Sequence, residues 1–168
     1  MFVIVLDRSP GEHEWDGIVA AGLDDAMFGV EHGVPSAEFD REAPTLADAV
    51  AGAVRALESV ELVALRVIDQ DLVTLADIAD RIEQSRESVR RYATGERGAG
   101  GFPPPANPAR DGTVFYRWSE VVPWLEEHVS ISVPQVDPAL VFANLIVQAR
   151  QLRRRVDHLS ALTDLLAA

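Results

Sequence analysis

The amino-acid sequence predicts an α+β protein built from three parts, which span residues 1–70, 71–129 and 137–168. In the first part, short apolar runs alternate with segments of helical period. The second part holds two capped helices followed by a loop rich in glycine and proline. The third part carries neither glycine nor proline after residue 138, so we expect one long helix there.

The first 70 residues predict the order strand-helix-strand-strand-helix-strand. Apolar, partly β-branched runs mark the strands, and Thr45 is a suitable cap for the second helix. The expected strands are 2–6, 26–30, 34–39 and 62–68, and the expected helices are 12–22 and 45–59. The first helix carries Trp15, Ile18 and Val19 at helical spacing. This order is typical of a ferredoxin-like βαββαβ sandwich, which hosts many unrelated functions.

The composition predicts a soluble, cytoplasmic protein that is not an enzyme. The chain has 168 residues, 48% of them hydrophobic, which is enough to bury a core. No apolar run approaches the roughly 20 residues that cross a bilayer, and the start lacks the basic region of a signal peptide. There is no cysteine, which excludes disulfides and thiolate chemistry. Because the four histidines lack the spacing of metal ligands and the sequence contains no cofactor-binding loop motif, we expect no metal and no cofactor. These histidines are His13, His32, His128 and His158.

The formal net charge of −12 is distributed unevenly. Residues 1–70 carry 14 acids and 4 arginines, residues 71–128 carry 10 and 7, and residues 129–168 carry 3 and 4. We interpret the acids of the first part as a solvated face, because none falls into a metal-binding motif. A site for a small effector or a protein partner on this domain remains an alternative.

The middle of the chain predicts a helix-turn-helix. Thr74 is a suitable N-cap for a first helix, and Ser85 for a second helix over 86–93. In the second helix Val89 and Tyr92 would pack inward, which leaves the arginines at 86, 90 and 91 outside. The N-terminus of such a helix can approach phosphate while its first side chains reach base edges.

A wing made of two extended segments joined by a loop is expected to follow. Glycines at 98, 100 and 101 end the helical region, and an extended proline run begins at Phe102. A loop containing Arg110 would lead to a strand over 113–116, after which Ser119 would cap a last helix with Trp118 packed behind it. The alternative is a plain helical hairpin whose arginines pair with glutamates 83, 87 and 96.

The stretches TLADIA, SRESVRRY, GGFPPP and RWSEVVPWL together resemble the winged helix-turn-helix of the MerR and phage-excisionase class. This resemblance covers about one third of the chain. It implies that Ser85, Arg86 and Arg90 face the major groove of DNA, and that Arg110 follows the backbone or minor groove. Gln84 departs from the pattern, since a glycine or small residue is usual there. The residues expected at DNA are Thr74, Ser85, Arg86, Glu87, Arg90, Arg91, Arg97, Arg110 and Arg117.

The C-terminal part shows a heptad repeat. Leucines at 145, 152, 159 and 166 fall seven residues apart, a pattern compatible with a coiled coil. We therefore expect a homodimer formed through residues 138–166. The alternative is an amphipathic helix that packs on its own protein.

These observations predict a sequence-specific, DNA-binding transcriptional regulator that acts as a homodimer on double-stranded DNA. One module of this size buries too little surface for typical specific affinity, which favours a dimer on paired half-sites. The alternative is an antitoxin-like or adaptor protein whose acidic N-terminal domain binds another protein.

Overall fold

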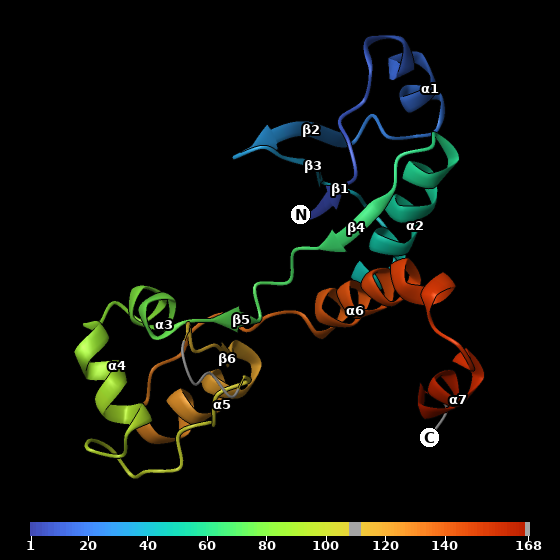
Figure 1. The fold of residues 1–168 in the computed structure, drawn as a ribbon. Coiled ribbons are helices and arrows are strands. Elements are labelled where there is room, and N and C mark those ends of the chain that lie inside the picture. The colour runs from blue at the N-terminus through green and yellow to red at the C-terminus, as the bar shows by residue number, and fades with distance from the viewer. Residues whose placement is uncertain (108–111, 167–168) are drawn as a thin grey trace. The chain divides into compact units, whose positions relative to one another are not determined.

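The computed structural model describes residues 1–107 and 112–166 and confirms the α+β class (Figure 1). The chain forms two compact units. One unit combines Met1–Ile68 with Pro138–Ala168, and the other is Asp69–Asp137. The C-terminal part, which we expected to stand apart, therefore belongs to the first unit.

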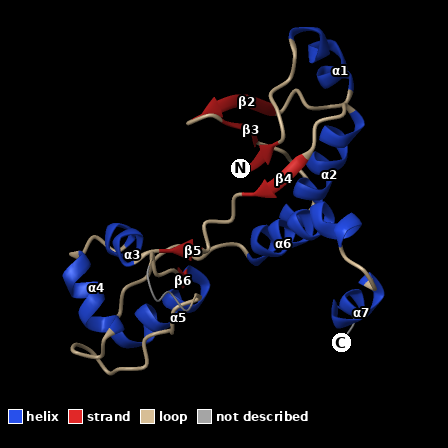
Figure 2. Cartoon of the chain, in the orientation of Figure 1, coloured by secondary structure: helices blue, strands red, loops and turns tan. Residues whose placement is uncertain are grey.

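A four-stranded antiparallel sheet forms the first unit's framework (Figure 2). Its strands lie in the order β2-β3-β1-β4, and every neighbouring pair is antiparallel. They are β1 (Phe2–Leu6), β2 (Ala26–Glu31), β3 (Val34–Phe39) and β4 (Ala64–Val67). His32 and Gly33 join β2 to β3 with φ values of 50° and 79°. Positive φ at both positions matches the right-handed twist of the hairpin.

Three helical segments complete the part of this unit before residue 69: the short η1 (Glu12–Glu14), α1 (Trp15–Ala20) and α2 (Leu46–Ser59). The Thr45 side chain accepts a hydrogen bond from the Asp48 backbone N–H, as its role of N-cap predicts. On α1 only Ile18 is buried, while Trp15 and Val19 are exposed. A two-turn helix presents too narrow a face to bury all three side chains.

The helix α6 (Pro138–Leu152) packs on this unit beside β4. Its Asn144 Oδ1 accepts a hydrogen bond from Val67 N at 3.1 Å, and its Gln151 Nε2 donates to Ala64 O at 2.8 Å. Val147 enters the core. The helix thus covers a strand edge whose free backbone groups would otherwise invite pairing with another chain.

A single helix over 138–166 is not observed, so that expectation was wrong. After α6 come the 3-10 turn η2 (Arg153–Arg155), α7 (Leu159–Thr163) and the 3-10 turn η3 (Asp164–Leu166). Val156 is extended and His158 has a φ of 55°. This break interrupts the heptad register.

The second unit contains β5 (Leu72–Val73), α3 (Leu75–Arg81), α4 (Arg86–Ala93), β6 (Tyr116–Arg117) and α5 (Trp118–Val129). One hydrophobic core joins these helices and strands. The strand expected at 113–116 is shorter and starts later, and its partner is β5. No helix within the described ranges is long and apolar enough to cross a membrane.

Candidate nucleic-acid interface

A capping box starts α3. Thr74 Oγ1 accepts a hydrogen bond from Asp77 N at 3.2 Å, and Asp77 Oδ2 accepts from Thr74 N at 2.7 Å. The hydrogen bonds from the Thr74 backbone and hydroxyl lower the pKa of Asp77. Thr74 was expected at DNA, but its hydroxyl is occupied by this cap.

The turn between α3 and α4 places its left-handed residue at Glu83, with a φ of 53°. The position that favours glycine is therefore 83, one residue earlier than the sequence pattern indicated. Gln84 Oε1 is buried without a hydrogen-bond partner among the described residues. A buried, unmet acceptor is destabilising, so this turn carries two local costs.

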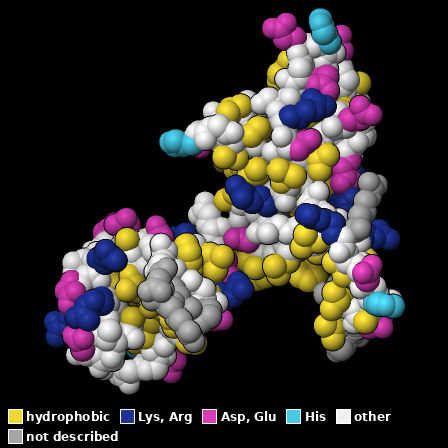
Figure 3. Space-filling model, in the orientation of Figure 1, with side chains coloured by type: hydrophobic (Ala, Val, Ile, Leu, Met, Phe, Trp, Pro, Cys, Tyr) yellow, Lys and Arg dark blue, Asp and Glu magenta, His cyan; other side chains and the backbone are white. Residues whose placement is uncertain are grey.

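The helix α4 presents one face to the core and one to solvent. Ser85 Oγ accepts a hydrogen bond from Ser88 N at 3.2 Å and caps the helix, as predicted. Val89 and Tyr92 are buried. Arg86 and Arg91 are exposed and have no ion pair within the described part of the chain. This unit's surface carries arginines interspersed with acidic side chains (Figure 3).

Arg90 is held by two carboxylates. Its Nε and Nη2 donate to both oxygens of Glu87 at 2.9 and 2.8 Å. Its Nη1 and Nη2 donate to both oxygens of Glu96 at 3.0 and 3.1 Å. These hydrogen bonds raise the pKa of Arg90 and lower those of Glu87 and Glu96. The alternative of arginines paired with glutamates is therefore correct for Arg90, whose charge is more than neutralised.

Two further arginines expected at DNA have contacts within their own unit. The Arg97 guanidinium lies 5.1 Å from the centre of the Tyr92 ring and donates to Ser88 Oγ at 3.3 Å. Arg117 Nη1 donates to Asp71 Oδ2 at 3.0 Å. The Arg97 contacts keep that arginine beside α4. Arg117 precedes α5 as its N-cap residue and binds Asp71 there.

Asp71 is a buried carboxylate that organises the start of α5. Its side chain is only 2% exposed, and its Oδ1 accepts from Ser119 N at 2.8 Å. Burial alone would raise the pKa of Asp71, but hydrogen bonds from Ser119 and Arg117 outweigh burial and lower it. We had expected Ser119 to cap this helix, but it lies inside α5, whose N-cap is Arg117. Asp71 accepts the Ser119 N–H from outside the helix.

An aromatic cluster anchors the glycine-rich loop after α4. The Phe102 ring lies 5.0 Å from the Trp124 ring and 5.6 Å from that of Tyr116. Trp124 Nε1 donates to Gly100 O at 3.0 Å. Gly98 has a φ of 85°, and a Cβ there would lie 3.4 Å from the Tyr92 ring. These contacts therefore define the path of the loop along α5 and beside the end of α4.

Asn107 hydrogen-bonds to the segment that was expected to form the wing strand, a role that the sequence did not suggest. Its Oδ1 accepts from Phe115 N at 2.7 Å, and its Nδ2 donates to Thr113 O at 3.0 Å. Ala106 N also donates to Phe115 O at 2.8 Å. An asparagine between prolines is a turn signal that could have marked it. Arg110 lies outside the described residues.

Six of the nine predicted residues therefore lie on α4 or immediately beside it: Ser85, Arg86, Glu87, Arg90, Arg91 and Arg97. The residues that the structure describes contain no cluster of His, Cys, Asp or Glu suited to a metal ion. Comparisons with protein-family models, with curated proteins and with solved structures give no match.

Proposed function

We propose that this chain is a sequence-specific DNA-binding transcriptional regulator whose second unit is a winged helix-turn-helix. The observation that carries the proposal is α4, a capped helix that buries Val89 and Tyr92 and leaves Arg86 and Arg91 exposed and unpaired among the described residues. In this arrangement a helix N-terminus and two guanidinium groups are available to phosphate and base edges. The sheet order β2-β3-β1-β4 supports a ferredoxin-like first unit.

For Arg90 to contact DNA, its guanidinium must exchange its carboxylate partners for groups of the DNA. The Glu87 and Glu96 carboxylates must release this guanidinium before it can contact a phosphate or a guanine. Two acids on one arginine also leave a negative charge where DNA would approach. We therefore infer a weak affinity for a single copy, and sequence preference that depends on α4 more than on general attraction.

We propose that two copies bind together through α6. The heptad leucines Leu145 and Leu152 are 56% and 52% exposed, although Val147 on the same helix is buried. An outward apolar stripe of this kind is suited to a second copy of itself. Sedimentation analysis of Leu145→Glu tests this step: a dimer that this substitution leaves intact would exclude α6 as the interface.

Fluorescence anisotropy on duplexes selected from a random pool tests the DNA proposal. We expect binding that weakens as salt rises, since phosphate contacts release counterions. Arg90→Ala should reduce the preference for the selected duplex over a shuffled one. If the selected duplex binds equally well after this substitution, α4 is not the recognition helix.

A second candidate is an antitoxin-like or adaptor role for the acidic first unit. Two of the four arginines before residue 69 are committed to ion pairs, Arg8 with Glu14 and Arg41 with Asp25. Many acids of this unit are therefore unbalanced, which suits a basic protein partner. Purification from the host distinguishes the roles by whether nucleic acid or a stoichiometric polypeptide accompanies the chain.

A further inference from the structure

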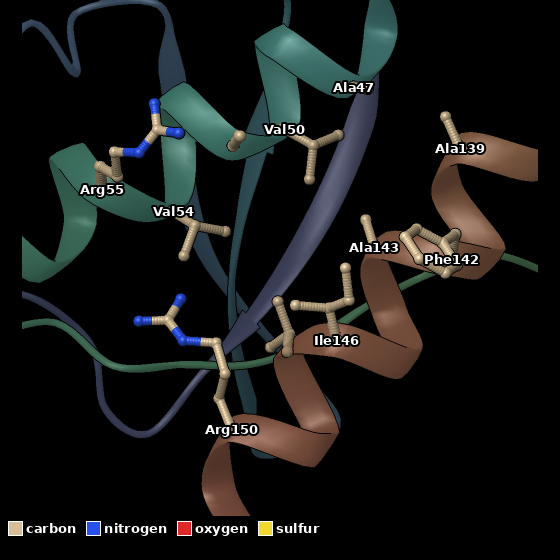
Figure 4. A pocket seen from close by; sticks show the side chains of 11 residues that line it. Ala47, Val50, Val54, Arg55, Ala139, Phe142, Ala143, Ile146 and Arg150 are labelled. Carbon is tan, nitrogen blue, oxygen red and sulfur yellow. The ribbon is translucent and has the colours of Figure 1, made fainter. Parts of the chain in front are cut away.

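An apolar groove lies between α2 and α6 in the first unit (Figure 4). Its volume is about 330 Å³, near the lower end of the range for small-molecule sites. Val50 and Val54 of α2 and Val147 of α6 are buried at its base. Small side chains such as Ala47 and Ala143 line it from the two helices and leave the space open.

Two arginines, Arg55 of α2 and Arg150 of α6, line one end of this groove. Figure 4 shows Arg55 of α2 and Arg150 of α6 at the end away from Ala47 and Ala139. Arg150 Nη2 donates to Glu58 Oε1 at 2.7 Å, so its charge is balanced. Arg55 is exposed and has no ion pair within the described ranges. In a strongly acidic unit, this end therefore carries about one uncompensated positive charge.

We propose that the groove binds a small apolar molecule with a single carboxylate, such as a medium-chain fatty acid. The groove's volume lies near the lower end of the range for small-molecule sites, which suits a short carbon chain. The apolar walls exclude sugars and nucleotides, which would lose hydrogen bonds to water there. A guanidinium binds a carboxylate through two parallel hydrogen bonds, and one net charge matches a monoanion better than a phosphate.

Two features favour a ligand over a second copy of the chain as the occupant. The groove is concave, with buried valines at its base, whereas the heptad leucines Leu145 and Leu152 do not line it. The unpaired Arg55 also gives the apolar groove a polar end, as is usual in small-molecule sites. The proposal does not depend on DNA binding, so either can fail without the other.

Isothermal titration of the full chain with octanoate tests the site, with 1-octanol as the uncharged probe of equal length. We expect octanoate to bind and 1-octanol to bind about tenfold more weakly, because it lacks the charge-assisted hydrogen bonds. Arg55→Gln should lower octanoate affinity to the level of 1-octanol. The control Arg66→Gln, an exposed arginine that does not line the groove, should leave both unchanged.

Filling the groove gives the second arm of the test. Ala143→Leu should abolish binding of both probes, and the exposed rim variant Ala47→Leu repeats the test if Ala143→Leu does not fold. The proposal is overturned if octanoate does not bind the wild-type chain, or if a folded filling variant binds it as well as wild type does. It is also overturned if a filling variant only converts a dimer to a monomer, since a second copy would then occupy the groove.

Discussion

The buried carboxylate of Asp71 provides the sharpest test of how the second unit is held together. Asp71→Ala removes the acceptor for Ser119 N and the partner of Arg117. Losing a helix cap costs about 1 kcal/mol. The buried donor left unmet and the lost charged hydrogen bond add roughly 1–3 kcal/mol. We therefore expect Asp71→Ala to lower the free energy of unfolding by about 2–4 kcal/mol.

Asp71→Asn keeps an acceptor for Ser119 but removes the charge, so its cost should be about half as large. Urea denaturation followed by circular dichroism measures both, with the exposed Asp80→Asn as the control. We expect the loss in the free energy of unfolding to be largest for Asp71→Ala, smaller for Asp71→Asn and smallest for Asp80→Asn. If Asp71→Ala is no more destabilising than Asp80→Asn, the proposed role of this carboxylate is wrong.

The same carboxylate predicts a pH dependence. The pKa of folded Asp71 lies below its usual 3.8, so its stabilising contribution is complete well above pH 3.8. That contribution is lost as the pH falls below 3.8 and through the folded pKa. Asp71→Asn should therefore flatten the loss of stability at acidic pH. An unchanged slope in the variant between pH 5 and pH 3, measured by urea denaturation, would contradict this assignment.

Two other substitutions test the surroundings of α4. Glu83→Gly should raise the free energy of unfolding by about 1 kcal/mol in urea denaturation, because glycine adopts the left-handed conformation without strain; a loss of stability would contradict this. Glu87→Gln combined with Glu96→Gln should release Arg90 and strengthen DNA binding in fluorescence anisotropy. An affinity below that of wild type would show that these glutamates position Arg90 for DNA and do not compete for it.

Local signals in the sequence predicted much of the fold. Thr45, Thr74 and Ser85 cap the helices at which they were expected, because a cap is decided by side chains within three residues. The order of strands and helices along the first unit also agrees with the alternation of apolar runs. The last strand, β4, is shorter than the expected range 62–68. On α4, the inward Val89 and the outward Arg86 follow directly from helical spacing.

Interactions between distant residues were not predictable in this way. The heptad leucines continue to residue 166, so periodicity alone did not predict the break at Val156 and His158. The hydrogen bonds of Asn144 and Gln151 to β4 join residues 77 and 87 positions apart. The capture of Arg90 by Glu96 depends on how the chain turns after α4. Each of these features requires tertiary structure before its residues can be paired.

The most direct test of the central proposal is the preference for a selected duplex over a shuffled one, measured by anisotropy for Arg86→Ala and Arg66→Ala. Both substitutions remove one exposed arginine, but only Arg86 lies at the start of α4. If α4 reads DNA, Arg86→Ala reduces the ratio of affinities by about tenfold, while Arg66→Ala leaves it unchanged. Equal ratios in both variants and the wild type would contradict the account.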